Sequence, residues 1–229
     1  MNAVLSALAG RLVVSCQPVD HGPLDHDDSV RRLALAALAG GAAGLRIEGA
    51  ARVALLRAAC SVPIIGIVKR DLADSPVRIT PWLADVQALL AAGAHIIAVD
   101  ATQRARPVPV AALLHAIHQG GALAMADCSC VDDALAAHTL GFDIVGTTLA
   151  GYTGGAMPTE PDIALVAGLA QRGLRVMAEG RLHSPAQAAA ARAAGAWAVT
   201  VGSAITRPEL TTQWFCEGIA GLSQIRPLA

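Results

Sequence analysis

The stretch AAGAHI, from Ala91 to Ile96, ends a helical segment on a glycine and passes directly into an apolar run. Three further segments repeat this design, namely TLGFDI (139–144), QRGLRV (171–176) and AAGAWAV (193–199). A glycine at this place can adopt the left-handed conformation that ends a helix. The apolar residues after it favour a strand. The repetition therefore predicts a chain built from βα units.

Eight short apolar runs fit the strands of such units. They are LVVSC (12–16), AGLRI (43–47), PIIGIV (63–68), HIIAVD (95–100), LAMAD (122 or 123 to 127), DIVGTT (143–148), LRVMAE (174–179) and WAVTVG (197–202). Alanine-rich segments between them open on Pro, Ser or Asp and close on Gly, as helices do. We therefore predict an α/β fold, a (β/α)8 TIM barrel that forms a single domain over residues 1–229. A doubly wound open sheet fits less well, because no GxGxxG motif follows the first run.

The composition favours a small molecule as the partner. Of 229 residues, 54% are hydrophobic, and 17 Lys+Arg against 18 Asp+Glu give a net charge of -1. This balance offers no broad charged surface to nucleic acid or to a membrane. The longest apolar run, Leu33 to Leu45, is too short to span a bilayer and is interrupted by Gly40 and Gly41.

The cysteines indicate a reducing compartment. They are five in number and show no CxxC spacing, which favours free thiols in a cytoplasmic protein over a disulfide framework.

A polar cluster near the N-terminus raises the question of a metal. His21, Asp25, His26 and Asp27 could hold one. A solvated loop that caps the next helix through Asp27 or Asp28 explains them more simply, so we predict no metal site.

Polar side chains close nearly every predicted strand. In a (β/α)8 barrel these strand ends meet at one mouth, where the chemistry takes place. We interpret Asp100 as structural, because an aspartate there often caps the following helix. The convergence of the other strand ends predicts one site; its members are Gln17, Arg46, Lys69, Asp127 and Glu179.

Lys69 ends the run PIIGIV, which reads as a strand buried on both faces. A lysine is seldom buried without a purpose. Its ordinary pKa near ~10.4 would have to fall to about 7 or 8 for it to act as a base at neutral pH. Burial lowers a lysine pKa, whereas an ionised Glu179 nearby would raise it again, so we expect the two groups to titrate as a coupled pair.

The segment after the eighth strand predicts an anion site. Gly202 and Ser203 form a tight turn that opens a short helix, whose free N–H groups favour a phosphate. Gly180 and Arg181, after the seventh strand, would supply the other half, because phosphate is commonly bound by loops seven and eight of this fold. Arg207 adds a cation nearby.

Several motifs together resemble the N-acetylmannosamine-6-phosphate 2-epimerase family of bacterial sialic acid breakdown. They are VSCQ (14–17), IIGIVKRD (64–71), VRIT (77–80), VDAT followed by RP (99–107), MADCS (125–129), GTTLAGYTG (146–154), AEGR (178–181) and VGSAITRP (201–208). The matching blocks run in order from Leu12 to about Phe215. IGIVKRD and GTTLAGYT are far more specific than a lone glycine motif.

The resemblance implies a phosphate-binding (β/α)8 barrel that interconverts N-acetyl-D-mannosamine 6-phosphate and N-acetyl-D-glucosamine 6-phosphate. It implies Lys69 and Glu179 as catalytic residues and a phosphorylated N-acetyl amino sugar as substrate. The sugar-contacting positions it implies are Gln17, Arg46, Asp127, Tyr152 and Arg207. The sequence departs from some family members just after Arg46, where it reads Ile47-Glu48-Gly49. The resemblance therefore gives no expectation for the contacts near Glu48.

The expected reaction needs no cofactor. Once the sugar opens to its aldehyde, C2 can lose a proton to leave an enolate, which requires a base, a proton donor, a group for the enolate oxygen and an anchor for phosphate. Lys69 and Glu179 could act from opposite faces, or Lys69 alone could remove and return the proton. Arg46 could stabilise the oxyanion or contact the phosphosugar, and Asp127 could bind a hydroxyl or orient Lys69.

Two other functions fit the same residues. A strand-end lysine could form a Schiff base, as in an aldolase or lyase. A barrel that only senses phosphosugars would need neither Lys69 nor Glu179, so their joint presence argues against it. The apolar balance of the chain suits a homodimer.

Overall fold

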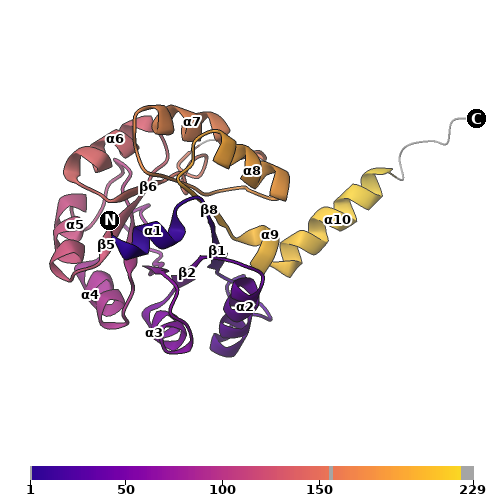
Figure 1. Cartoon of the computed structure of the whole chain (residues 1–229), viewed down its shortest axis with the longest axis horizontal. Helices are drawn as coiled ribbons and strands as arrows, with labels where there is room; N and C mark the ends of the chain where they lie inside the picture. The colour runs from indigo at the N-terminus through magenta and orange to yellow at the C-terminus, as the bar shows by residue number, and fades with distance from the viewer. Residues whose placement is uncertain (1, 155–156, 223–229) are drawn as a thin grey trace, which may run out of the picture.

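Eight parallel strands close into one barrel in the computed structural model of the chain, which describes residues 2–154 and 157–222 (Figure 1). They pair in chain order, and β1 closes the ring by pairing with β8. The strands are β1 (Leu12–Cys16), β2 (Gly44–Glu48), β3 (Ile64–Ile67), β4 (Ile96–Asp100), β5 (Leu123–Asp127), β6 (Ile144–Gly146), β7 (Val176–Ala178) and β8 (Ala198–Val201). The predicted (β/α)8 TIM barrel is confirmed.

Helices follow the strands and surround the barrel (Figure 1). They are α1 (Ala3–Leu8), α2 (Asp27–Ala39), α3 (Ala50–Ala59), α4 (Leu83–Ala91), α5 (Val110–Gln119), α6 (Val131–Leu140), α7 (Ile163–Gln171), α8 (Pro185–Ala193), α9 (Ser203–Thr206) and α10 (Pro208–Leu222). The first and the last differ from the rest: α1 precedes β1, and α10 projects away from the barrel.

The glycines that end the repeated segments have the conformation the sequence predicts. Gly93, Gly141, Gly173 and Gly195 have φ angles of 81°, 104°, 79° and 102°. A side chain would strain the backbone at these angles. Each glycine thus allows the chain to leave a helix and enter the next strand within a few residues.

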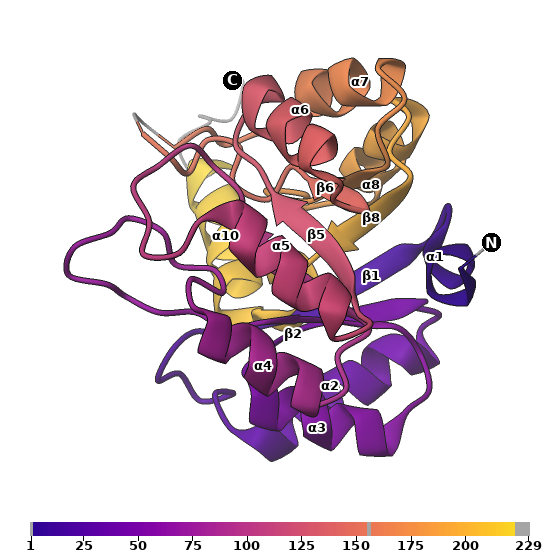
Figure 2. The same ribbon diagram turned by 90° about the vertical axis from the view of Figure 1, so that its left-hand side faces the viewer.

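The core has two layers, one inside the barrel and one between the strands and the helices. Side chains such as Ile65, Ile96, Met125 and Met177 fill the interior. Helix α1 closes one end of this interior with Leu8, which is fully buried. Figure 2 places α1 on the side of the barrel away from the long loops that follow the strands.

The loop between β3 and α4 forms a small hairpin over the mouth. Lys69 forms an isolated antiparallel bridge with Ile79, and the Arg70 N–H donates to the carbonyl of Arg78. Ile79 belongs to the buried cluster of the barrel interior. The loop is therefore anchored in the barrel rather than lying free on its surface.

The polar cluster near the N-terminus is tied to an arginine. Asp25 and Asp27 accept hydrogen bonds from Arg52 of α3. The expected cap of α2 by Asp27 or Asp28 is wrong, because the helix begins at Asp27 and His26 occupies the cap position. No group of three or more His, Cys, Asp or Glu suited to a metal occurs in the described part of the chain.

The cysteines carry free thiols. Burial raises the pKa of the Cys16 thiol to about 12, which makes it an unreactive core residue. Within residues 2–154 and 157–222, no helix has the length and apolar character needed to cross a bilayer.

Candidate active site

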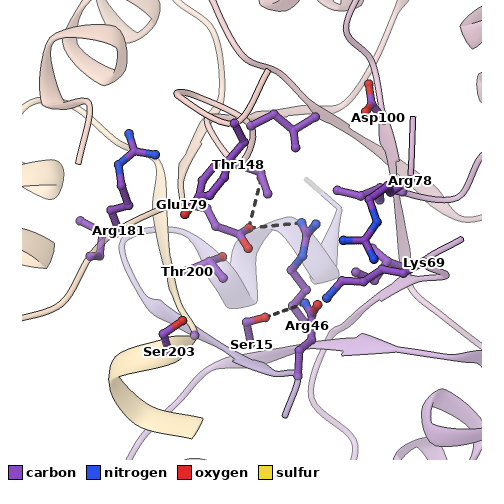
Figure 3. Close-up of a pocket in the computed structure, with 18 of the residues that line it drawn as sticks. Ser15, Arg46, Lys69, Arg78, Asp100, Thr148, Glu179, Arg181, Thr200 and Ser203 are labelled. Atoms are coloured by element: carbon purple, nitrogen blue, oxygen red, sulfur yellow. Dashed lines mark hydrogen bonds and ion pairs between the residues drawn. The ribbon is translucent and has the colours of Figure 1, made fainter. Parts of the chain in front are cut away.

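A cavity of about 390 Å³ opens where the strands of the barrel end (Figure 3). It brings together residues from β1, β2, β3, β4 and β8 and from loops at the same end of the barrel, including those after β6 and β7. Those predicted from the sequence are Gln17, Arg46, Lys69, Tyr152, Glu179, Gly180, Arg181, Gly202, Ser203 and Arg207. Asp127 is the one predicted site residue that does not line it.

Lys69 lies just beyond the buried strand β3, and its side chain enters the cavity (Figure 3). Burial lowers the pKa of its ammonium group, and the charge of Arg207 lowers it further. Asp20 and Glu48 oppose this shift. A lowered pKa increases the fraction of lysine in the neutral amine form, which is the form that acts as a base. The structure thereby gives Glu48 an electrostatic influence on Lys69 that the sequence left open.

Glu179 follows β7 and faces the cavity with a side chain that is 12% exposed. Burial raises its pKa to about 7, although the Arg46 charge opposes the rise. The charge of Lys69 also lowers the pKa of Glu179; titration of the two groups as a coupled pair stays a prediction. A carboxyl with this pKa can give or take a proton at neutral pH.

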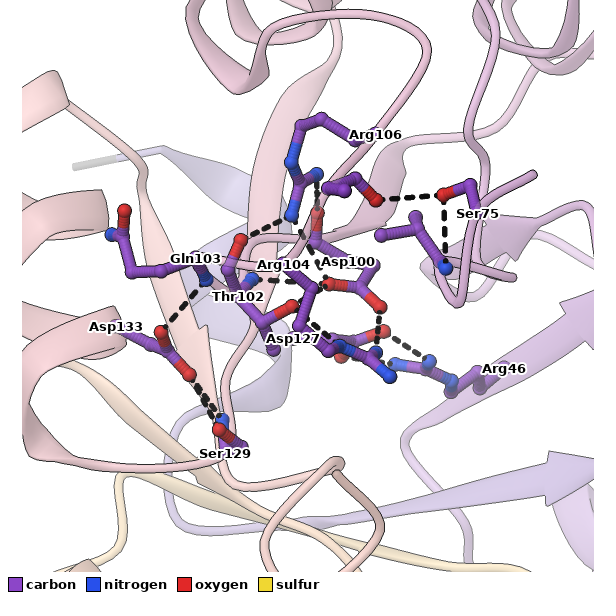
Figure 4. Close-up of polar contacts among 12 residues, drawn as sticks. Arg46, Ser75, Asp100, Thr102, Gln103, Arg104, Arg106, Asp127, Ser129 and Asp133 are labelled. Atoms are coloured by element: carbon purple, nitrogen blue, oxygen red, sulfur yellow. Dashed lines mark hydrogen bonds and ion pairs between the residues drawn. The ribbon is translucent and has the colours of Figure 1, made fainter. Parts of the chain in front are cut away.

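Arg46 and Asp127 form a buried ion pair beneath the cavity (Figure 4). Nη2 of Arg46 lies 2.7 Å from Oδ2 of Asp127, and Nη1 lies 3.2 Å from Oδ1. Nη1 is also 3.2 Å from Oε2 of Glu179. Burying the charge of an arginine without carboxylate partners would cost free energy. Asp127 and Glu179 supply these partners. The guanidinium therefore has a fixed position between the walls of the barrel.

Asp127 was expected to bind substrate or to orient Lys69, and the structure gives it a different neighbour. Its side chain is fully buried, bonded to Arg46 and absent from the cavity lining. Thr148 donates to Oδ1 of Asp127 at 2.6 Å and lies 3.4 Å from Oε2 of Glu179. Asp127 thus orients Arg46 and Thr148.

Gln17 and Arg207 meet at the rim from opposite ends of the chain. Gln17 donates through Nε2 to Oγ of Ser15 at 2.8 Å, and Arg207 donates through Nε to the backbone carbonyl of Gln17 at 2.7 Å. Arg207 therefore both places a positive charge at the cavity and fixes the loop that carries Gln17.

Arg181, in the loop after β7, holds the loop after β6. It donates through Nη1 to the carbonyl of Ala150 and through Nε to that of Glu160, and its guanidinium lies 5.3 Å from the ring centroid of Tyr152. The side chain thus holds the loop that carries Tyr152. Gly180 beside it has a φ of 107°, a conformation that favours glycine.

The cavity wall also contains residues that the sequence did not assign to the site, among them Arg78, Arg104 and Thr148. Arg104 donates to Oδ2 of Asp100 and to Oγ1 of Thr102 (Figure 4). Asp100 also lines the cavity, and the expected capping of the next helix by Asp100 is wrong, because Pro109 occupies the cap position of α5. Thr148 was visible as a polar end of the sixth run. Arg104 gave no such signal, because it lies four residues past its strand.

The chain matches the family model described as "Putative N-acetylmannosamine-6-phosphate epimerase" over residues 30–221. It is 58% identical over 219 residues to a protein of Yersinia pseudotuberculosis serotype O:3 (strain YPIII), which covers 96% of this chain and 94% of the relative. A Yersinia pestis (strain Pestoides F) protein is 60% identical over 212 residues, covering 93% of this chain and 91% of the relative. Both carry the name "Putative N-acetylmannosamine-6-phosphate 2-epimerase".

A solved structure agrees with these relatives. The N-acetylmannosamine-6-phosphate 2-epimerase from Clostridium perfringens superposes with a TM-score of 0.91 at 39% identity, covering 94% of this chain and 96% of that one. The family model, the close relatives and this structure all point the same way: the chain belongs to the N-acetylmannosamine-6-phosphate epimerase family.

Proposed function

We propose that this protein is a 2-epimerase that interconverts N-acetyl-D-mannosamine 6-phosphate and N-acetyl-D-glucosamine 6-phosphate. The observation that carries the proposal is the placement of Lys69 and Glu179 in one cavity, on strands four apart in a closed ring of eight. Burial moves the pKa of each group toward neutrality, downward for Lys69 and upward for Glu179. These are the shifts that proton transfer at neutral pH requires.

The reaction removes and returns the proton at C2. The sugar opens to its aldehyde, the neutral amine of Lys69 takes the C2 proton, and the electron pair moves to the carbonyl oxygen as an enolate. Return of a proton to the other face inverts C2. Either Glu179 donates that proton, or Lys69 returns it after the intermediate rotates. Neither route consumes a redox or nucleotide cofactor.

Arg46 is our candidate for stabilising the enolate oxygen. It lines the cavity, and its two acidic neighbours fix it in place. A fixed donor of this kind stabilises a developing negative charge without having to reorganise.

The phosphate would bind across loops seven and eight. Gly180 and Arg181 on one side and Gly202 and Ser203 on the other line the cavity, and Arg207 adds positive charge there. Because the guanidinium of Arg181 is bonded to carbonyls, we assign its contribution to the backbone. Gln17 and Tyr152 line the same cavity, and we assign them to binding of the sugar.

The test is conversion of N-acetylmannosamine 6-phosphate in D2O without added cofactor, followed at C2 by proton NMR. We expect N-acetylglucosamine 6-phosphate with deuterium at C2 from the wild type and no conversion by Lys69→Ala. Binding of the phosphosugar by Lys69→Ala should persist in calorimetry, since the phosphate contacts remain. Carbon–carbon cleavage, or covalent trapping of substrate by borohydride, would instead establish Schiff-base chemistry.

We further propose that the protein acts in the cytoplasm as a homodimer. The free thiols suit a reducing compartment. Helix α10 projects from the barrel (Figure 1), and its Phe215 and Ile219 are 69% and 66% exposed. Large apolar side chains gathered on a projecting helix favour association, and a second copy of the chain is the partner we propose.

A further inference from the structure

Thr80 has an unusual backbone conformation next to the active site. It is fully buried, and its φ angle is +48°. A β-branched residue with a positive φ is a genuine outlier. Such a conformation costs free energy and persists only where the surroundings fix it, most often at functional sites.

The hydrogen bonds of Thr80 join the end of β3 to β4. Its N–H donates to the carbonyl of Val68 at 2.7 Å, and its Oγ1 accepts from the Val68 N–H at 3.2 Å. The same hydroxyl donates to the carbonyl of Ala98 in β4 at 2.7 Å. Thr80 therefore satisfies both backbone groups of the residue that precedes Lys69.

This arrangement fills a gap between the two strands. The direct pairing of β3 with β4 reaches Gly66 and Ile97. Beyond that point the carbonyl of Ile79 accepts from the N–H of Asp100 at 3.1 Å, while Ile79 bridges to Lys69 on the other side. The hairpin thus inserts a short segment between the strand ends, and Thr80 fastens it on both sides.

The residue after Lys69 is held as well. Arg70 donates through Nε and Nη2 to Oδ1 of Asp85, at 2.8 and 2.6 Å. Asp85 is buried in the first turn of α4 and accepts from the N–H of Trp82. The residues on each side of Lys69 are therefore held by hydrogen bonds. The side chain of Lys69 enters the cavity from a fixed point of the backbone.

We propose that Thr80 is a positioning residue for Lys69: its hydroxyl and N–H fix Val68 and the hairpin, and so set the point from which the Lys69 amine reaches C2. The inference rests on the proposed epimerase function. It differs from a purely structural role because it predicts loss of the chemical step with little loss of substrate binding, since Thr80 does not line the cavity.

The experiment compares Thr80→Val, Thr80→Ser and wild type in the NMR assay. Valine keeps the shape but removes the bonds of Oγ1 to Val68 and Ala98. We expect kcat to fall by about 100-fold, the effect of a small misplacement of a catalytic group, with KM nearly unchanged. The acidic limb of the kcat–pH profile should also move, because the surroundings of the Lys69 amine change. Serine keeps the hydroxyl and should restore kcat.

Thr139→Val is the matched control, because Thr139 lies on α6 and its hydroxyl donates to the carbonyl of Leu135 and to no other group among the residues that the structure describes; it should leave kcat unchanged. If Thr80→Val does not fold, Thr80→Gly replaces it, since glycine accepts the positive φ without the hydroxyl, and the same loss of kcat is expected. Full kcat in the variant that lacks the hydroxyl, or no rescue by serine, overturns the role of Thr80. An inactive wild type overturns the proposed function itself.

Discussion

Burial shifts the pKa values of the two candidate proton-transfer residues in opposite directions. Burial disfavours charge, so it lowers the pKa of Lys69 and raises that of Glu179. Arg46 opposes the shift on Glu179 and adds to the shift on Lys69. One buried cation therefore tunes both sides of the reaction, and Asp127 keeps that cation in place.

The raised pKa of Glu179 makes a prediction for stability. Between 4.5, the ordinary pKa of a glutamate, and about 7, the folded protein holds a proton that the unfolded chain has released, so the free energy of unfolding falls as the pH rises through this window. Glu179→Gln removes that penalty. We expect the variant to gain stability over the wild type on going from pH 5 to pH 8, by on the order of 2 kcal/mol.

Urea denaturation of the ligand-free proteins at the two pH values measures this difference. Asp74→Asn is a suitable control, because it removes a carboxylate from an exposed position and should leave the pH dependence as in the wild type. A Glu179→Gln protein that gains nothing on going from pH 5 to pH 8 would contradict the assignment.

The sequence predicted the residues of the site better than their roles. Strand-end position placed Lys69, Glu179 and Arg46 correctly at the cavity. It could not tell that Asp127 lies behind Arg46, because side chains from neighbouring strand ends compete for the same space and only their packing decides which faces outward. Arg104 was missed for a related reason, since it reaches the cavity from within a loop.

At the scale of elements, the features predicted best were those with a local cause. The glycines that end α4, α6, α7 and α8 have left-handed angles whatever their surroundings, so sequence pattern alone located these boundaries. The insertion of residues 78–80 between β3 and β4 depends instead on contacts between segments distant in the sequence. Helix α1 was not predicted either, because its role is to cover the interior of a barrel formed by later residues.

Helix α8 gives a prediction at this scale. Its N-cap Ser184 accepts from the N–H of Gln187 at 3.2 Å, and the side chain of Gln187 accepts from the Ser184 N–H at 3.1 Å. Ser184→Ala should lower the free energy of unfolding by about 1 kcal/mol, the usual cost of losing such a cap. Ser184→Asp can make the same bond and should retain most of it.

Urea denaturation measures the free energy of unfolding of both variants. An unchanged m-value shows that the comparison reflects stability alone. An equal loss in the alanine and aspartate variants would show that packing around Ser184, and not the cap, carries the energy.

At the scale of the whole molecule, barrel closure is what assembles the site. Gln17 and Arg207 are 190 residues apart in sequence and share a hydrogen bond, because β1 pairs with β8. The cavity therefore depends on closure of the ring of strands, which brings the first and last strands of the chain together.

The proposed homodimer is tested through α10. Phe215→Lys places a charge among the exposed apolar residues of this helix and should shift the protein toward monomer. Gln213→Lys adds the same charge about 200° around the helix from Phe215 and should leave association unchanged. Sedimentation velocity over a range of concentrations measures the result. A wild type that remains monomeric throughout would refute the dimer.

Helix α1 covers the end of the barrel opposite the catalytic mouth (Figure 2). Leu8 packs so closely there that a Cβ on Gly44 would lie 2.6 Å from its Cδ2. The consequence is practical: a linker joined ahead of Asn2 would fix the enzyme to a bead or an electrode with its mouth turned toward the bulk liquid. Tethering through α10 would instead obstruct the surface proposed for dimerisation.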